Sequence, residues 1–163
     1  MVNRRQFLTG AATAGTVAIA GCSSAPLIGD GGPEDAVEQF FTATRNGDVE
    51  AANEVLHPES RYYPAEEDDL VDGNDSTVTD TNQVSTRELA EWEIERFSGS
   101  VDEASEEEIE ENTEGLQQLA EEQADGAGVD DFAWVLVTIE RDGEEQDFPV
   151  LTVQDDGDWY VLS

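Results

Sequence analysis

The sequence predicts an α+β domain in which an N-terminal helical hairpin packs on an antiparallel sheet. Two segments after residue 33 carry apolar residues at helical spacing, and the last third of the chain alternates apolar runs with two Asp-Gly pairs. Asp-Gly between apolar runs is a strong signal for a two-residue hairpin turn. The chain is therefore expected to end in a three-stranded meander.

The predicted hairpin has clear start and stop signals. Pro33 suits a helix start, and the helical spacing runs over residues 34–45 until Asn46-Gly47 stops the helix. Asp48 can cap a second helix, which His57-Pro58 terminates.

The middle of the chain has weaker patterns. Tyr62 and Tyr63 predict the start of a short extended piece, and the polar run from Glu66 to Gln83 predicts an exposed loop. Residues 86–97 fit two patterns, because alternate residues are apolar as in a strand, while other apolar positions partly fit a helix. We interpret them as a strand.

A capping-box pattern predicts a further helix. Ser105 is followed by Glu108, and Ile109, Leu116 and Leu119 form a narrow apolar stripe before about residue 124. Because the stripe is narrow and the helix acidic, we expect it to dock lightly.

The C-terminal meander has a predicted register. If both turns close as two-residue hairpins, Trp134 lies opposite Leu151, which lies opposite Leu162; Ala133, Thr152 and Val161 align on the other face. The strand over residues 132–139 is apolar on both faces, so both need cover. We expect helices on one face and a partner subunit, as in a homodimer, on the other.

The first 21 residues have the layout of an export signal. Arg4-Arg5, with Phe7-Leu8 close behind, precede a weakly apolar run of small residues that is shorter than the roughly 20 residues a membrane span needs. This layout resembles a twin-arginine signal. The run ending in Gly21-Cys22 resembles a lipobox, in which the Cys thiol is acylated before cleavage.

These motifs divide the chain into a signal peptide (1–21), a lipidated Cys22 with a flexible tether (22–33) and one domain (34–163). The resemblance implies a lipid-anchored protein at the extracytoplasmic face of the cell membrane. Since Cys22 is the only cysteine, its lipidation leaves no disulfide, zinc cluster or thiol nucleophile.

The composition is strongly acidic. The chain has 40 Asp and Glu, seven arginines, no lysine and a net charge of −33, and only two arginines belong to the leader. Self-repulsion of this size is largely screened at about 1 M salt, where the Debye length is near 3 Å. The composition therefore resembles that of extremely halophilic archaeal proteins. It also argues against nucleic-acid binding, which needs clustered Lys and Arg.

The predicted hairpin, the phrase Asn46-Gly47-Asp48 and the C-terminal Asp156-Gly157-Asp158-Trp159-Tyr160 together resemble the nuclear-transport-factor-2-like superfamily. That resemblance implies a cone-shaped α+β fold with a curved sheet and covers about residues 34–60 and 130–163. Such domains include enzymes, ligand binders and lipoproteins, so the fold does not choose an activity.

Few residues are candidates for chemistry. Isomerases and dehydratases of this superfamily place an acid-base group in the cone, for which His57 and Tyr62 are the weak candidates here; a helix-end role and packing are their simpler interpretations. An apolar pocket could be lined by four aromatic residues, with core packing as the alternative: Phe40, Phe132, Trp134 and Tyr160.

No metal site or cofactor is predicted. The acidic loop over residues 68–79 departs from the calcium-loop pattern at Leu70 and Thr79. Asn74 begins a sequon for N-glycosylation, which chance often supplies. We therefore expect a non-catalytic, membrane-tethered domain that binds a small ligand or a protein partner. An isomerase-like enzyme and a structural envelope component are the alternatives.

We predict that the domain loses structure when salt is lowered from molar concentration to about 0.1 M, because the acidic side chains then repel one another with less screening. Far-ultraviolet circular dichroism measures the change. A spectrum that stays constant over this range contradicts the halophilic interpretation.

Overall fold

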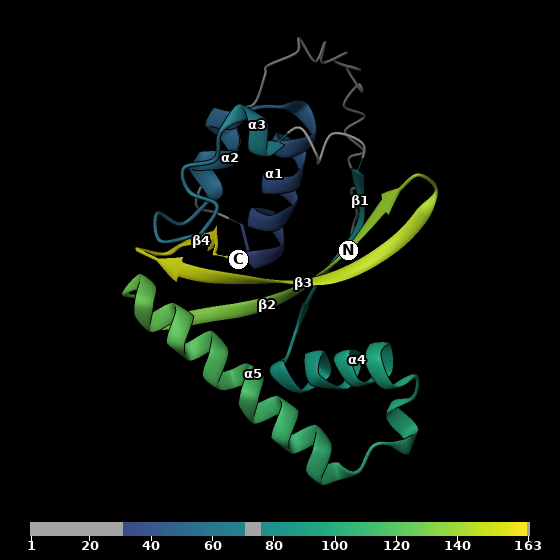
Figure 1. Ribbon diagram of the computed structural model, residues 1–163. Coiled ribbons are helices and arrows are strands. Elements are labelled where there is room, and N and C mark those ends of the chain that lie inside the picture. The colour runs from purple at the N-terminus through teal and green to yellow at the C-terminus, as the bar shows by residue number, and fades with distance from the viewer. Residues whose placement is uncertain (1–30, 71–75, 163) are drawn as a thin grey trace, which may run out of the picture.

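The computed structural model describes residues 31–70 and 76–162 and has the predicted α+β architecture. A curved four-stranded antiparallel sheet has the order β1-β2-β3-β4, with α1 to α3 on one side and α4 and α5 on the other (Figure 1). In chain order the elements are α1 (Pro33–Asn46), α2 (Val49–Val55), α3 (Glu67–Leu70), β1 (Ser76–Val84), α4 (Thr86–Ser98), the 3₁₀ helix η2 (Val101–Glu103), α5 (Glu106–Ala127), β2 (Asp131–Arg141), β3 (Glu144–Asp155) and β4 (Asp158–Val161).

The N-terminal helical hairpin is confirmed. Gly47 ends α1 in the left-handed conformation, at φ 66°, where glycine pays no steric cost. The Asp48 carboxylate then accepts a hydrogen bond from the Ala51 backbone N–H at 3.1 Å and caps α2. Only Gly47 and Asp48 separate the two helices, so this tight connection keeps α1 and α2 neighbours.

The C-terminal meander is confirmed in register. Trp134 pairs with Leu151, and Thr152 pairs with both Ala133 and Val161. The Leu162 backbone N–H donates to the Leu151 carbonyl at 2.9 Å, as the predicted pairing requires. At both hairpin turns the Asp and the Gly have positive φ, the geometry that matches the twist of the flanking strands.

Side chains on the two faces of β2 and β3 belong to two separate apolar clusters. Val135, Val137 and Val150 pack with α1 and α2, whereas Trp134 and Leu151 pack on the other face. That second face is covered by Leu89 of α4 and by Ala120 and Ala124 of α5. Helices of the same chain therefore cover both faces, and a homodimer through the sheet stays a prediction.

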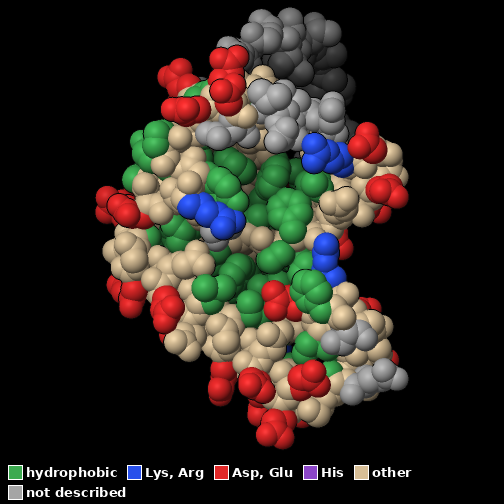
Figure 2. Space-filling model, viewed as in Figure 1, with side chains coloured by type: hydrophobic (Ala, Val, Ile, Leu, Met, Phe, Trp, Pro, Cys, Tyr) green, Lys and Arg blue, Asp and Glu red, His purple; other side chains and the backbone are tan. Residues whose placement is uncertain are grey.

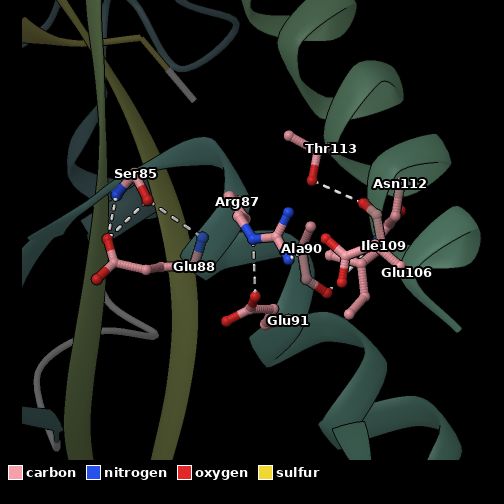
Figure 3. Close-up of polar contacts among 9 residues, drawn as sticks. All are labelled: Ser85, Arg87, Glu88, Ala90, Glu91, Glu106, Ile109, Asn112 and Thr113. Atoms are coloured by element: carbon pink, nitrogen blue, oxygen red, sulfur yellow. Dashed lines mark hydrogen bonds and ion pairs between the residues drawn. The ribbon is translucent and has the colours of Figure 1, made fainter. Parts of the chain in front are cut away.

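The expected strand over residues 86–97 is wrong, because this segment is helix α4. Ser85 Oγ accepts from the Glu88 backbone N–H at 3.2 Å, and the Glu88 carboxylate accepts from the Ser85 backbone N–H at 2.8 Å (Figure 3). The Ser85 hydroxyl also donates to the Glu88 carboxylate, at 2.7 Å, and the hydrogen bonds that this carboxylate accepts from the Ser85 backbone and side chain lower the pKa of Glu88. The reciprocal cap satisfies two N–H groups at the helix start, and Leu89, Ala90 and Ile94 form the buried face.

The expected exposed loop over residues 66–83 is also wrong. Residues 67–70 form α3, and residues 76–84 form β1, which pairs with β2 at the edge of the sheet. The side chains of β1 are mostly exposed, so the strand has no apolar alternation for a sequence pattern to detect. The extended piece expected at Tyr62 is instead a turn, closed by the Tyr63 N–H bond to the Ser60 carbonyl at 3.0 Å.

Helix α5 forms as predicted, but its buried stripe differs. Ser105 caps it, and Ile109 is buried, whereas Leu119 is 45 % exposed. Two small residues of α5, Ala120 and Ala124, are buried in the same apolar cluster as Leu151 of the sheet. Light docking of this helix stays a prediction.

Polar contacts join α5 to α4. Figure 3 shows Arg87 between Glu91 and Glu106, with nitrogen-to-oxygen distances of 3.0 and 2.8 Å. The Asn112 side-chain amide also donates to the Ala90 carbonyl at 3.3 Å. The two helices therefore form a second hairpin that lies against the sheet as a pair.

We predict that Leu151→Ala lowers the free energy of unfolding by about 2–5 kcal/mol, because a fully buried leucine leaves a cavity between β3 and α5. Leu119→Ala is the matched control and should change stability by less than about 0.5 kcal/mol. Thermal or denaturant unfolding in about 1 M salt measures both. Equal losses in the two variants would contradict the assigned burial.

Candidate ligand-binding cleft

An apolar cleft of about 420 Å³ lies between α1 and the sheet. Its wall is completed by the turn after α2, by α3 and by the ends of β1 and β2. Figure 2 shows hydrophobic side chains gathered in the middle of one face of the molecule, with most acidic side chains at its periphery. The volume falls within the range of about 300–1,000 Å³ typical of small-molecule sites.

Three phenyl rings form the apolar wall. Phe40 and Phe41 lie side by side on α1 with ring centroids 5.4 Å apart, and Phe41 meets Phe148 of β3 edge to face at 5.6 Å. Phe148 pairs with Val137, so it faces α1 as Val137 does. The helix and the strand thus hold the rings in fixed positions that an apolar molecule can contact.

The turn after α2 is fixed by a side-chain clamp. Asn53 of α2 donates to the Ala65 carbonyl at 3.0 Å and accepts from the Ala65 N–H at 2.8 Å. Ser60, itself buried, accepts from the Tyr62 N–H at 3.3 Å through its hydroxyl. These bonds hold the backbone on both sides of Arg61 and Tyr62 and place both side chains in the cleft wall.

Arg61 and Tyr62 form a pair at this wall. The Arg61 guanidinium lies 4.7 Å from the centroid of the Tyr62 ring, and its Nη2 donates to the Tyr62 hydroxyl at 2.6 Å. Both side chains are exposed. Within the described residues Arg61 makes no ion pair. Stacking on the ring orients a positively charged group that retains most of its donors.

The electrostatic character of the cleft differs from that of the rest of the surface. Two arginines, Arg61 and Arg141, belong to the described lining, which contains no Asp or Glu. Four other hollows of the described surface each include at least one carboxylate side chain. In a chain with 40 acidic residues, the cleft is therefore a local exception.

His57 lies apart from this cleft. Its ring is buried, its Nδ1 accepts from the Glu59 N–H at 3.2 Å, and its Nε2 is 3.9 Å from an Asp155 carboxylate oxygen. The ring also meets Tyr160 edge to face at 5.9 Å. His57 and Tyr62, the two weak catalytic candidates, are therefore placed differently: Tyr62 lines the cleft and His57 does not.

Among the four aromatic residues considered as pocket lining, only Phe40 lies in the cleft wall. Trp134 belongs to the second apolar cluster, against which Phe132 and Tyr160 pack. Partial burial, together with the nearby charges of Asp158, Asp155 and Asp156, raises the pKa of Tyr160. These three aromatic residues serve the packing of α5 on the sheet.

Phe40 and Tyr62 are among the residues that the sequence suggests as candidates, but three other important residues of the cleft wall are not: Phe41, Phe148 and Arg61. Phe41 and Phe148 look like ordinary core residues, and Arg61 stands in an irregular segment. One signal was available for Arg61, because arginine is scarce in a chain this acidic and this one adjoins Tyr62. The pairing of Asn53 with Ala65, 12 positions along the chain, follows no local sequence rule.

Other sequence-based candidates lie outside the described residues. These are the leader residues Arg4, Arg5, Phe7 and Leu8, the lipidation site Cys22 and the sequon residue Asn74. Over residues 31–70 and 76–162, no group of three or more His, Cys, Asp or Glu is arranged to hold a metal ion. None of the described helices is both long and apolar enough to span a bilayer.

The fold and the cleft are the basis for any functional inference. Comparisons with protein-family models, with curated proteins and with solved structures found no match to this chain.

Proposed function

We propose that this chain is a membrane-tethered extracytoplasmic lipoprotein whose domain binds a small, largely apolar ligand without catalysing a reaction. The cleft of about 420 Å³ between α1 and the sheet is the observation that carries the binding role. Burial of apolar surface against Phe40, Phe41 and Phe148 supplies the favourable free energy, about 25 cal/mol per Å².

The chemistry of the cleft favours binding over catalysis. A general acid-base site needs a group that exchanges protons near neutral pH, most often His, Asp or Glu. The described lining contains none of these, and its ionisable side chains are Arg61, Tyr62 and Arg141. Arginine and tyrosine serve as general acids or bases less often than His, Asp or Glu. The lining can therefore hold and orient a ligand more readily than it can transfer a proton.

The resemblance to the nuclear-transport-factor-2-like superfamily is part of this proposal. Its support is the α1–α2 hairpin lying against a curved antiparallel sheet (Figure 1), together with the cleft lined by residues of α1 and of the sheet. In such a fold the concave side of the sheet suits a pocket, and the same place holds the cleft here.

We predict that Phe148→Ala weakens the binding of Nile red, a neutral apolar dye, by severalfold, because the variant removes one of the three rings of the cleft wall. Dye fluorescence measures binding to the full chain carrying Cys22→Ser, which prevents acylation. The solution should contain about 1 M salt to keep the domain folded.

Phe97→Ala is the matched control for this experiment. Phe97 is 79 % exposed near the end of α4, on the other side of the sheet from the cleft. Its substitution therefore removes a phenyl ring, as Phe148→Ala does, but leaves the cleft wall unchanged. Circular dichroism checks that both variants are folded. Dye binding that depends equally on the two rings, or on neither, contradicts the proposed binding role.

The membrane anchor rests on the leader sequence. We predict that Cys22→Ser releases the exported protein from membranes, because the sulfur that would carry the lipid is lost and no basic cluster is present in the sequence to replace it. Fractionation of cells by centrifugation, followed by immunodetection, measures the distribution. Continued membrane retention of the exported variant refutes a lipid anchor at this residue.

A further inference from the structure

We propose that the cleft selects an amphipathic carboxylate, such as a medium-chain fatty acid, whose head group pairs with Arg61 and whose chain lies against the phenyl wall. This inference rests on the proposed binding function and specifies its ligand class. It depends on three features of the described residues: the charge of the lining, the geometry of Arg61 and the apolar depth behind it.

The charge of the lining favours an anion. Carboxylates line each of the four other described hollows, where they would repel an anionic ligand, whereas the described lining of this cleft contains the Arg61 guanidinium and no carboxylate. Repulsion from the rest of the molecule acts over a distance and is screened at high salt, where the Debye length is about 3 Å. A direct contact between the ligand and a guanidinium is much less screened. The charge of the groups that touch the ligand therefore determines whether the cleft binds an anion.

The geometry of Arg61 favours a carboxylate head group. A guanidinium presents donors in a planar fork that matches the two oxygens of a carboxylate. Tyr62 holds this fork by stacking and by accepting one hydrogen bond from Nη2, which leaves donors of the same group for a ligand. The Arg61 ion-pair capacity is not used by any described side chain.

The wall behind this head-group position favours an alkyl chain. Most of the lining is apolar, with Phe40, Phe41 and Phe148 joined by Leu70 and Val150. Thr44, which also lines the cleft, donates its hydroxyl proton to the Phe40 carbonyl at 2.8 Å. A ligand with one charged end and an apolar body satisfies both parts of the site.

Titration with octanoate and with 1-octanol tests the inference, because the two probes have the same chain length and differ in charge. In about 1 M salt, the full chain carrying Cys22→Ser should bind octanoate about fivefold to tenfold more tightly than 1-octanol, the advantage expected of a charge-assisted hydrogen bond at a partly exposed site. Nuclear magnetic resonance detects it: the Arg61 Nε–H signal should shift with octanoate and not with octanol.

Arg61→Gln should remove the preference for octanoate over 1-octanol, and Arg61→Lys should restore only part of that preference, because lysine lacks the planar fork. Arg87→Gln is the matched control. It alters the net charge equally, but Arg87 lies on α4, across the sheet from the cleft, and its ion pairs are with Glu91 and Glu106, so the variant should leave both affinities unchanged.

A homologous series tests the apolar part of the site. From butanoate to hexanoate to octanoate, affinity should rise about threefold to fourfold for each methylene buried. An affinity that does not change with chain length would mean that only the carboxylate is bound and that the alkyl chain stays in solvent. That result would overturn the inference.

The outcomes separate this inference from the function on which it rests. Equal binding of octanoate and octanol, both weakened by Phe148→Ala and neither affected by Arg61→Gln, overturns the choice of a carboxylate and keeps the binding cleft. Binding of both probes that is insensitive to Phe148→Ala overturns the cleft itself.

Discussion

The pairing of β2 with β3 is the constraint on which the rest of the structure depends. Eleven residue pairs join these strands, and the side chains of alternate residues belong to two apolar clusters on opposite faces of the sheet. Because side chains alternate with a period of two, a slip of one residue would exchange the faces and break both clusters. The Asp142-Gly143 turn fixes that register, since its two residues adopt the positive φ values that a two-residue hairpin requires.

The same register places the cleft. Phe148 pairs with Val137 and so faces α1, where it meets Phe41, while the neighbouring Asp147 lies on the opposite face. The rest of the wall comes from a turn held by Asn53, whose amide bonds both backbone groups of Ala65. A regular sheet thus provides the apolar wall of the site, and an irregular turn provides its charged group.

This division explains how much the sequence could predict. The meander and the first hairpin rest on local signals, namely Asp-Gly turns and the Asp48 cap, and both are confirmed. The sequence predicts a strand where α4 forms, although Ser85 and Glu88 have capping-box spacing, because alternate residues of this segment are also apolar. Strand β1 gave no such signal, since pairing at an edge needs backbone groups rather than buried side chains. The cleft combines residues from distant elements, which no local pattern joins.

The acidity of the chain affects how an arginine can recognise an anionic ligand. At low salt the field of 40 carboxylates would repel an anion from every part of the surface. At molar salt that field decays within a few ångströms, and recognition depends on groups in direct contact with the ligand. Arg61 is such a group, because Tyr62 orients it and the described lining around it is apolar and contains no carboxylate. High net charge and anion selectivity are therefore compatible, provided that the selective group lies in direct contact with the ligand, as Arg61 does in the proposed site.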